Sequence, residues 1–294
     1  MARAARLLSL NPLRLAQPAV PPTTQAVILA RGLGTRMRRT GHEAHANTLS
    51  TAQASAADRG LKAMIPLRRP FLDYVLASLA DAGITDAILV IGAEHESVRE
   101  YFTVTAPPAR IRVRFAVQAS ARGTADAVLA ARAAVGAAPF LVLNSDNYYP
   151  VAAIRALATL GESGLVAFEA AALVRDGGIE EERVLRYALV DFDDRDVLTS
   201  ITEKPGPDDP LAQRPERWVS MNLWSFTPRI FEACTRVTAS ARGELELQSA
   251  VMIAIHDLGE RFRVVISRAG VLDLSSRSDI VMVAARLAHL DPRP

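Results

Sequence analysis

The first half of the chain alternates between short apolar runs and amphipathic stretches. Residues 25–29 form an apolar run that predicts a buried strand. Residues 70–83 place Leu72, Val75 and Leu79 on one helical face, with a proline near the start and a glycine at the end. Similar patterns predict strands at 86–91, 111–117 and 140–143 and helices at 94–102 and 124–135. This alternation indicates a largely parallel sheet covered by helices.

The second half of the chain has a looser pattern that indicates a mixed, more antiparallel arrangement. It predicts strands at 165–168, 187–192, 197–202, 219–226, 263–266 and 271–274 and helices at 228–235, 246–257 and 277–290. No hexapeptide period is present, so a β-helix domain is not indicated. The sequence therefore predicts one α/β domain over residues 25–294.

Two segments lack periodic apolar residues. Residues 1–24 contain arginines and prolines but no acidic residue, and we expect a disordered tail, with a transit peptide as the alternative. Residues 39–60 are rich in Ala, Thr, Ser and Gln and have no clear period. They predict a long surface insertion that is mobile without ligand.

Composition narrows the range of partners. The formal net charge of +2 indicates neither a nucleic-acid nor an anionic-membrane partner, and no apolar stretch is long enough to cross a bilayer. Cys234 is the only cysteine, so neither a disulfide within the chain nor a cysteine-based zinc site can form. These features fit a cytoplasmic protein.

The basic residues are divided very unevenly between arginine and lysine. Of the 34 basic residues, only Lys62 and Lys204 are lysines and the other 32 are arginines. Lysine is a compact point charge and arginine a wide planar fork, so a confined phosphate site can require lysine. Chance survival of two lysines is the alternative interpretation.

A glycine-containing loop follows the first predicted strand. It reads Ala30, Arg31, Gly32, Leu33, Gly34, Thr35, Arg36. Glycines allow a tight turn whose amides can point at phosphate oxygens, and the second arginine can add a charged clamp. The loop is neither a Walker A motif nor a dinucleotide fingerprint, and an ordinary tight turn is the competing interpretation.

A second loop joins the predicted strand at 111–117 to the following helix. Gln118 can both donate to and accept from a nucleobase edge, and Gly123 allows close approach of a ligand. Thr124 begins the helix, whose N-terminus favours an anion. An ordinary strand–helix connection would look the same.

Acidic residues follow two predicted strands, where open α/β sheets bind their ligands. Asp146 comes just after the run at 140–143, and Asp273 lies near the end of the run at 271–274. Two such carboxylates and a triphosphate would bind Mg²⁺. Each aspartate alone is also typical of a cap or turn. A third strand is followed by the sequence Glu203, Lys204, Pro205.

Taken in order, these motifs resemble the sugar-1-phosphate nucleotidylyltransferases, the group that includes glucose-1-phosphate thymidylyltransferase. The resemblance runs from about Gln25 to about Leu290. It implies a Rossmann-like three-layer α/β/α fold with a mixed, mostly parallel central sheet. It also implies an Mg²⁺-dependent enzyme that joins a nucleoside triphosphate to a sugar 1-phosphate and releases pyrophosphate. The nucleotide half would extend to about residue 150 and the sugar half would follow.

The resemblance implies a role for each matching position. Ala30, Gly32, Gly34 and Thr35 would surround the triphosphate, while Gln118, Gly123 and Thr124 would contact the base side of the nucleotide. Arg36, Lys62, Asp146 and Lys204 would be the catalytic set, with Lys204 on the sugar phosphate. Glu203 and Asn222 would contact sugar hydroxyls, and Asp146 with Asp273 would bind Mg²⁺.

The chain also departs from the family pattern. Arg31 stands where a small residue is usual, Lys62 lies further from Arg36 than expected, and Ala188 replaces a glycine after Tyr187. Two other functions remain open: a same-fold transferase with a non-sugar phosphate acceptor, and a non-catalytic homologue that binds a nucleotide sugar. The sequence leaves the base, the sugar and the oligomeric state open, and a homo-oligomer is compatible with it.

Overall fold

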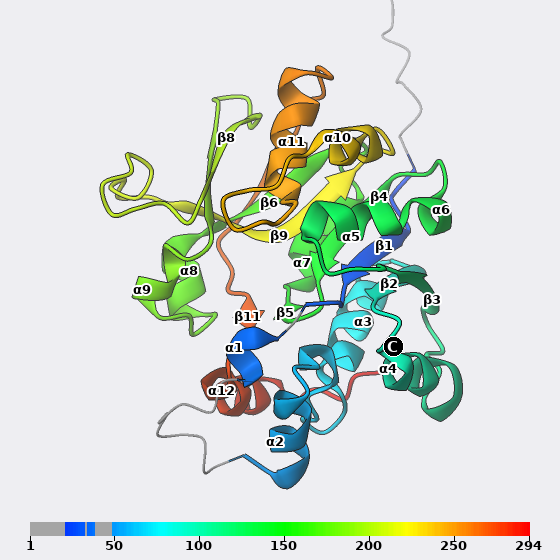
Figure 1. The fold of residues 1–294 in the computed structure, drawn as a ribbon. Helices are drawn as coiled ribbons and strands as arrows, with labels where there is room; N and C mark the ends of the chain where they lie inside the picture. The colour runs from blue at the N-terminus through cyan, green and yellow to red at the C-terminus, as the bar shows by residue number, and fades with distance from the viewer. Residues whose placement is uncertain (1–20, 33, 39–48) are drawn as a thin grey trace, which may run out of the picture.

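The computed structural model describes residues 21–32, 34–38 and 49–294 and has a single central sheet (Figure 1). The strands along the sheet are, in spatial order, β10 (Arg263–Ser267), β6 (Gly164–Glu169), β9 (Trp218–Phe226), β4 (Phe140–Asn144), β1 (Gln25–Leu29), β2 (Asp86–Ile91) and β3 (Arg112–Val117). Strands from both halves of the chain therefore share one sheet.

The sheet is mixed but mostly parallel. Strand β1 is parallel to β2 and β4, β2 is parallel to β3, and β6 is parallel to β10. Strand β9 is antiparallel to both of its neighbours β4 and β6. The antiparallel pair β7 (Ala188–Phe192) and β8 (Leu198–Glu203) is attached through β9. The predicted α/β fold class is confirmed.

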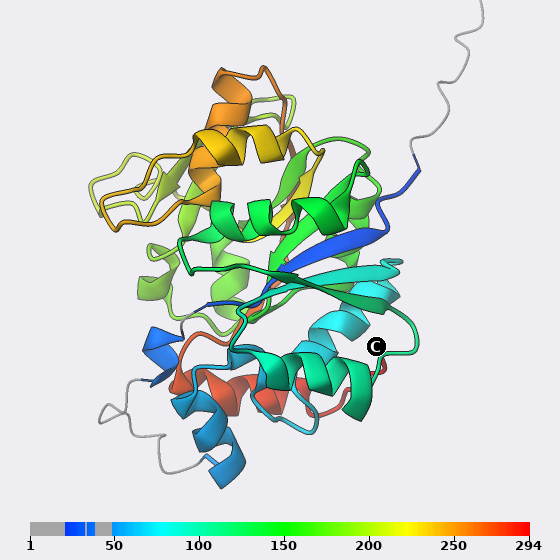
Figure 2. The ribbon, with the colours of Figure 1, turned by 45° about the vertical axis from the view of Figure 1, so that its right-hand side comes forward.

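Helices cover both faces of this sheet, as Figure 2 shows. One face carries α3 (Phe71–Asp81), α4 (Glu96–Glu100), α7 (Val151–Ala158) and α12 (Arg277–Leu287), and the other carries α5 (Thr124–Ala130), α6 (Arg132–Val135), α10 (Ile230–Arg236) and α11 (Leu247–His256). Successive residues of a strand pack alternately into the two cores: Val27 packs in one and Ile28 in the other. This alternation follows from the two-residue period of a strand.

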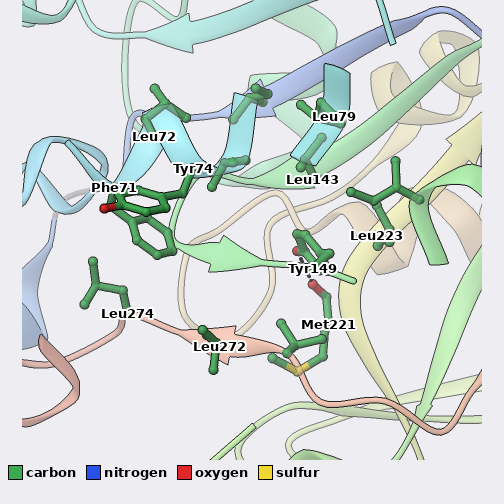
Figure 3. Close-up of a cluster of buried hydrophobic side chains, with 14 of the residues drawn as sticks. Phe71, Leu72, Tyr74, Leu79, Leu143, Tyr149, Met221, Leu223, Leu272 and Leu274 are labelled. Carbon is green, nitrogen blue, oxygen red and sulfur yellow. Dashed lines mark hydrogen bonds between the residues drawn. The ribbon is translucent and has the colours of Figure 1, made fainter. Parts of the chain in front are cut away.

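The core between α3 and the sheet extends to a small second sheet (Figure 3). Strands β5 (Asn147–Tyr148) and β11 (Leu272–Asp273) pair antiparallel there. Buried Phe71 and Leu79 of α3 belong to the same core as Leu272. The Tyr149 hydroxyl, fully buried, donates 2.6 Å to the carbonyl of Met221 in β9. This core fixes the segments after β4 and before α12 relative to each other.

The expected surface insertion at 39–60 contains a helix that the sequence pattern did not predict. Residues 39–48 lie outside the described residues, but Thr51–Asp58 form helix α2. Ser50 caps this helix: its hydroxyl accepts from the Gln53 amide, and the Gln53 side chain accepts from the Ser50 amide at 3.0 Å. Ala56 and Ala57 of α2 are buried, so small side chains attach the helix without a long-range apolar period.

Other boundaries and elements also differ from the sequence expectations. The Thr23 amide donates to the Ala158 carbonyl at 2.8 Å, so the expected tail boundary at residue 24 is placed too late; residues 1–20 are outside the described part. The sequence patterns missed helix α7 and the short elements α1 (Thr35–Arg38), η2 (Lys62–Met64), η3 (Tyr101–Thr105), α8 (Ala170–Arg175) and α9 (Glu181–Val184). Among the described residues, no helix is both long and apolar enough to span a membrane.

Candidate active site

Most of the predicted site residues lie where neighbouring parallel strands end. Backbone hydrogen bonds tie these strand ends together: the Ala30 amide donates to the Val90 carbonyl at 2.9 Å, and the Ser145 amide to the Leu29 carbonyl at 3.2 Å. The Gln118 amide donates to the carbonyl of the last β2 residue at 2.9 Å. The loops after β1, β3 and β4 therefore share one edge of the sheet, where α/β folds bind ligands.

The glycine loop contacts the segment that precedes Lys62. Gly34 has a φ of +61°, and a Cβ built on it would lie 2.6 Å from Gly60 Cα. The Gly60 carbonyl in turn accepts from the Lys62 amide at 3.0 Å. The long spacing between Arg36 and Lys62 therefore does not separate the glycine loop from the segment of Lys62, because the chain returns to the loop after α2.

The Lys62 ammonium and the Asp146 carboxylate form an ion pair across the strand ends. Lys62 Nζ lies 2.8 Å from Asp146 Oδ2, and the two side chains are 16% and 20% exposed. Gly32, Thr35 and Arg36 are exposed on the loop and α1. Among the ion pairs of the described residues, none joins Arg36 to Asp146. Of the expected catalytic set, Lys62 and Asp146 are in direct contact.

On the expected base side, Gln118 is held by its own loop. Its side-chain amide donates to the Gly123 carbonyl at 3.1 Å and to Asp126 Oδ2 at 2.8 Å. Gly123 has a φ of +125°, which only glycine adopts readily. The Thr124 hydroxyl accepts from the Leu247 amide at 2.9 Å, linking α5 to α11. Gln118 is 3% exposed, and its contact with a base stays a prediction.

Arg31, the departure from the family pattern, also contacts this side of the site. Its guanidinium donates to the backbone carbonyl of Gln118 and lies 3.3 Å from the Glu94 carboxylate. Only 12% of the Arg31 side chain is exposed. The extra arginine therefore joins the loop after β1 to the loops after β2 and β3.

The second expected metal ligand, Asp273, is 4% exposed and surrounded by donors. Its carboxylate accepts from Asn147 at 3.1 Å, Arg183 at 2.6 Å, Tyr187 at 2.5 Å and Ser275 at 2.8 Å. Burial raises the pKa of Asp273, and the charge of Asp146 raises it further, while Tyr187 and Arg183 oppose the rise. Hydrogen bonds from the protein thus already occupy both carboxylate oxygens of Asp273.

Asp146 and Asp273 are close neighbours through the small sheet. Asp273 is opposite Asn147 in the β5–β11 pair, and the Leu274 amide donates to the Asp146 carbonyl at 2.8 Å. The two aspartates therefore occupy one region, as expected, but with different surroundings.

Strand β7 links Asp273 to the strands that carry the expected sugar-binding residues, because Tyr187, just before β7, donates to Asp273. Ala188, which follows Tyr187, is opposite Glu203 in β8 and Ser220 in β9. Lys204 and Asn222 have φ values of +46° and +58°, a left-handed conformation that is rare outside glycine. Such a conformation costs free energy and persists only where the surrounding structure holds it. Conformations of this kind are found most often at functional sites.

Asn222 is held in this conformation by side chains behind it. Its Oδ1 accepts from Trp224 Nε1 at 3.3 Å and from Gln248 Nε2 at 3.0 Å. The register between β6 and β9 shifts here, with three β9 residues opposite one of β6. A bulge of this kind redirects a side chain out of the regular alternation.

Sequence reasoning named Glu203 but missed the charged residues near it and near Asp273, which are Arg242, Glu246 and Arg183. Burial and then the Glu246 carboxylate raise the pKa of Glu203 to about 7, against the opposing charge of Arg242. Arg242 itself pairs with Glu246 at 2.6 Å. The dense charge of residues 242–246 was a usable signal for this cluster. Arg183, by contrast, is one of 32 arginines and carries no local signal.

Sequence comparison finds relatives that are nucleotidyltransferases by name. The chain is 25% identical over 234 residues to the low-salt glycan biosynthesis nucleotidyltransferase Agl11 of Haloferax volcanii, covering 79% of this chain but only 57% of that protein. It is 26% identical over 236 residues to the UTP–glucose-1-phosphate uridylyltransferase AglF of the same organism, covering 79% and 83%. It is 26% identical over 281 residues to a glucose-1-phosphate thymidylyltransferase of Streptomyces antibioticus, covering 92% and 68%.

Solved structures show the same fold at lower identity. A UDP-glucose pyrophosphorylase complexed with UDP-glucose superposes with a TM-score of 0.67 at 17% identity, covering 90% of this chain and 98% of that one. The UTP-bound enzyme from Acinetobacter baumannii gives 0.68 at 18%, covering 92% and 95%. A family model described as nucleotidyl transferase matches residues 25–287. This match over most of its length shows that the chain belongs to the nucleotidyl transferase family.

Proposed function

We propose that this chain transfers a nucleotidyl group from a nucleoside triphosphate to a sugar 1-phosphate and releases pyrophosphate. The observation that carries the proposal is the Lys62–Asp146 pair at the strand ends, with Gly34 on one side and Asp273 on the other. The relatives named as uridylyltransferase and thymidylyltransferase act on glucose 1-phosphate by their names, which supports a sugar acceptor.

The reaction requires alignment and charge neutralisation rather than a base. An oxygen of the sugar phosphate, already anionic, forms a bond to the α-phosphorus while the bond from that phosphorus to the bridging oxygen breaks. The electron pair leaves with pyrophosphate. Lys62 and Arg36 would neutralise charge on the triphosphate, and Lys204 would hold the attacking phosphate in line.

The surroundings of Asp146 suit a ligand of Mg²⁺, whereas those of Asp273 do not. The Asp146 side chain is 20% exposed beside the loop and can join phosphate oxygens around Mg²⁺. Both oxygens of Asp273 already accept hydrogen bonds. Bound through Asp146, the ion would supply positive charge at the phosphates. A role for Asp273 as a second ligand, expected from the sequence, would require it to give up these donors.

Pyrophosphate release from a panel of triphosphates and sugar 1-phosphates tests the activity. At least one pair should give Mg²⁺-dependent turnover, and the preferred pair identifies base and sugar. Asp146→Asn should lower that turnover by several orders of magnitude. Asp194→Asn, on an exposed turn, is the matched control and should have no effect. Absence of turnover with every pair, or full turnover in Asp146→Asn, would contradict the proposal.

A further inference from the structure

A buried arginine lies between two aspartates beside the expected metal position. Arg183 of the one-turn helix α9 is 2.6 Å from Asp273 and 2.6 Å from Asp279. The three side chains are 12%, 4% and 6% exposed, so solvent screens them little. Asp279 also caps α12, accepting from the Ser276 amide at 2.7 Å. The arginine is therefore held by two anchored carboxylates.

The hydrogen bonds to Asp273 leave little room for a metal ion. Oδ1 accepts from Asn147 and Ser275, and Oδ2 accepts from Arg183, Tyr187 and Ser275. A carboxylate offers about four lone-pair positions in all. A metal bound to Asp273 would have to displace these donors and would lie against the guanidinium charge.

Asp146 has a different environment although it is nearby. Its Oδ2 meets a lysine ammonium, a flexible group that can be exchanged, and its side chain is partly open to solvent. Two neighbouring carboxylates thus have distinct partners, one exchangeable and one fixed.

We propose that Arg183 is a positioning residue that takes the place of a divalent cation at Asp273, so that Asp146 is the carboxylate through which the protein binds the metal. The inference rests on the proposed Mg²⁺-dependent function. Removing the Arg183 charge takes one of three donors from Asp273 Oδ2, which makes that carboxylate more available to a cation, and removes a nearby positive charge. Both changes raise metal affinity, since affinity rises with the number of carboxylate ligands.

Binding of Mn²⁺ alone, followed by the loss of the free-ion signal in electron paramagnetic resonance, tests the proposal without turnover. Arg183→Met should bind Mn²⁺ at least about tenfold more tightly than the wild type. Arg183→Lys retains the charge and should stay within about twofold. Adding Asp273→Asn to Arg183→Met should abolish the gain. A methionine variant no tighter than the wild type would overturn the proposal.

If Arg183→Met does not fold, two single aspartate variants still test the proposal through Mn²⁺ binding. Asp146→Asn should weaken Mn²⁺ binding at least about tenfold, whereas Asp273→Asn should change it less than about twofold. Equal weakening by both would overturn the inference while leaving the magnesium proposal intact. Binding unaffected by Asp146→Asn would overturn both, and pyrophosphate release would still test the transfer reaction separately. Thermal unfolding with and without Mn²⁺ confirms that each variant is folded.

Discussion

Lys204 combines a strained backbone with an expected role in catalysis, and substitution by glycine separates the two. Its φ is +46° and Pro205 follows, although residues before proline favour extended conformations. A left-handed non-glycine residue costs about 1–2 kcal/mol. Glycine removes this cost but adds about 0.5–1 kcal/mol of entropy in the unfolded chain. Lys204→Gly should therefore raise the free energy of unfolding by about 0.5 kcal/mol, or Tm by roughly 1–2 °C.

Turnover should change in the opposite direction. Loss of the ammonium should lower pyrophosphate release on the order of a hundredfold or more, because the attacking phosphate loses its alignment. Asp196→Gly is the matched control: Asp196 has a φ of +56° on the exposed turn between β7 and β8, at the opposite end of β8 from Lys204. It should gain similar stability and retain normal turnover.

The variant Lys204→Arg tests whether the shape of the cationic group matters as well as its charge. The wider guanidinium would push the phosphate out of line, so turnover should still fall although the charge remains. Differential scanning calorimetry and pyrophosphate release measure the two properties. Wild-type turnover in Lys204→Gly would refute the catalytic role. A Tm lowered by several degrees in Lys204→Gly but not in Asp196→Gly would refute the strain argument.

Three further predictions test other parts of the structure. Gly34→Ala should lower the free energy of unfolding by roughly 2 kcal/mol or more, because its Cβ would meet Gly60, whereas Gly32→Ala has open space and should have little effect on thermal unfolding. The folded pKa of Glu203, about 7, lies above its ordinary 4.5, so wild-type stability should fall as the pH rises from about 4.5 to about 7 relative to Glu203→Gln, as urea titrations at each pH would show. Ser50→Ala should cost about 1 kcal/mol in the same assay, and no change would contradict the cap.

The sequence pattern predicted the strands well because their burial is simple. All six residues of β2 are buried, so the apolar run at 86–91 matched its bounds. Helix α3, expected over 70–83, is observed as Phe71–Asp81 because its apolar stripe faces a single core. An element buried on one face, or along a short apolar run, leaves a pattern that can be read from neighbouring residues in the sequence.

Elements defined by distant contacts were not visible in this way. Helix α2 buries only alanines, which give no strong period, although the Ser50–Gln53 spacing was a usable capping signal. The apolar run at 271–274 predicted β11, but its two-residue partner β5 was missed, because β5 is a strand only through this pairing across more than a hundred residues. No local pattern encodes such a pairing.

For the site, the motifs suggested that Lys62 and Asp146 belong together but marked none of the partners of Asp273. The structure brings Lys62 to Asp146, which two separate motifs had suggested as members of one site. It also gives Asp273 an arginine partner that no motif marked. Charged contacts depend on the tertiary placement of both groups, and one arginine among 32 cannot be distinguished by composition.

The two cations also explain why an arginine-rich chain retains a lysine here. Arg183 uses its fork to bind Asp273 and Asp279 at once, which suits a permanent contact. Lys62 contacts the carboxylate that we propose as the metal ligand, so we expect its ammonium to give up that contact when metal and triphosphate bind. A compact charge on a flexible stem can move to a phosphate oxygen, whereas a bidentate guanidinium would hold the carboxylate. We therefore expect Lys62 to be the exchangeable cation of the site and Arg183 the fixed one.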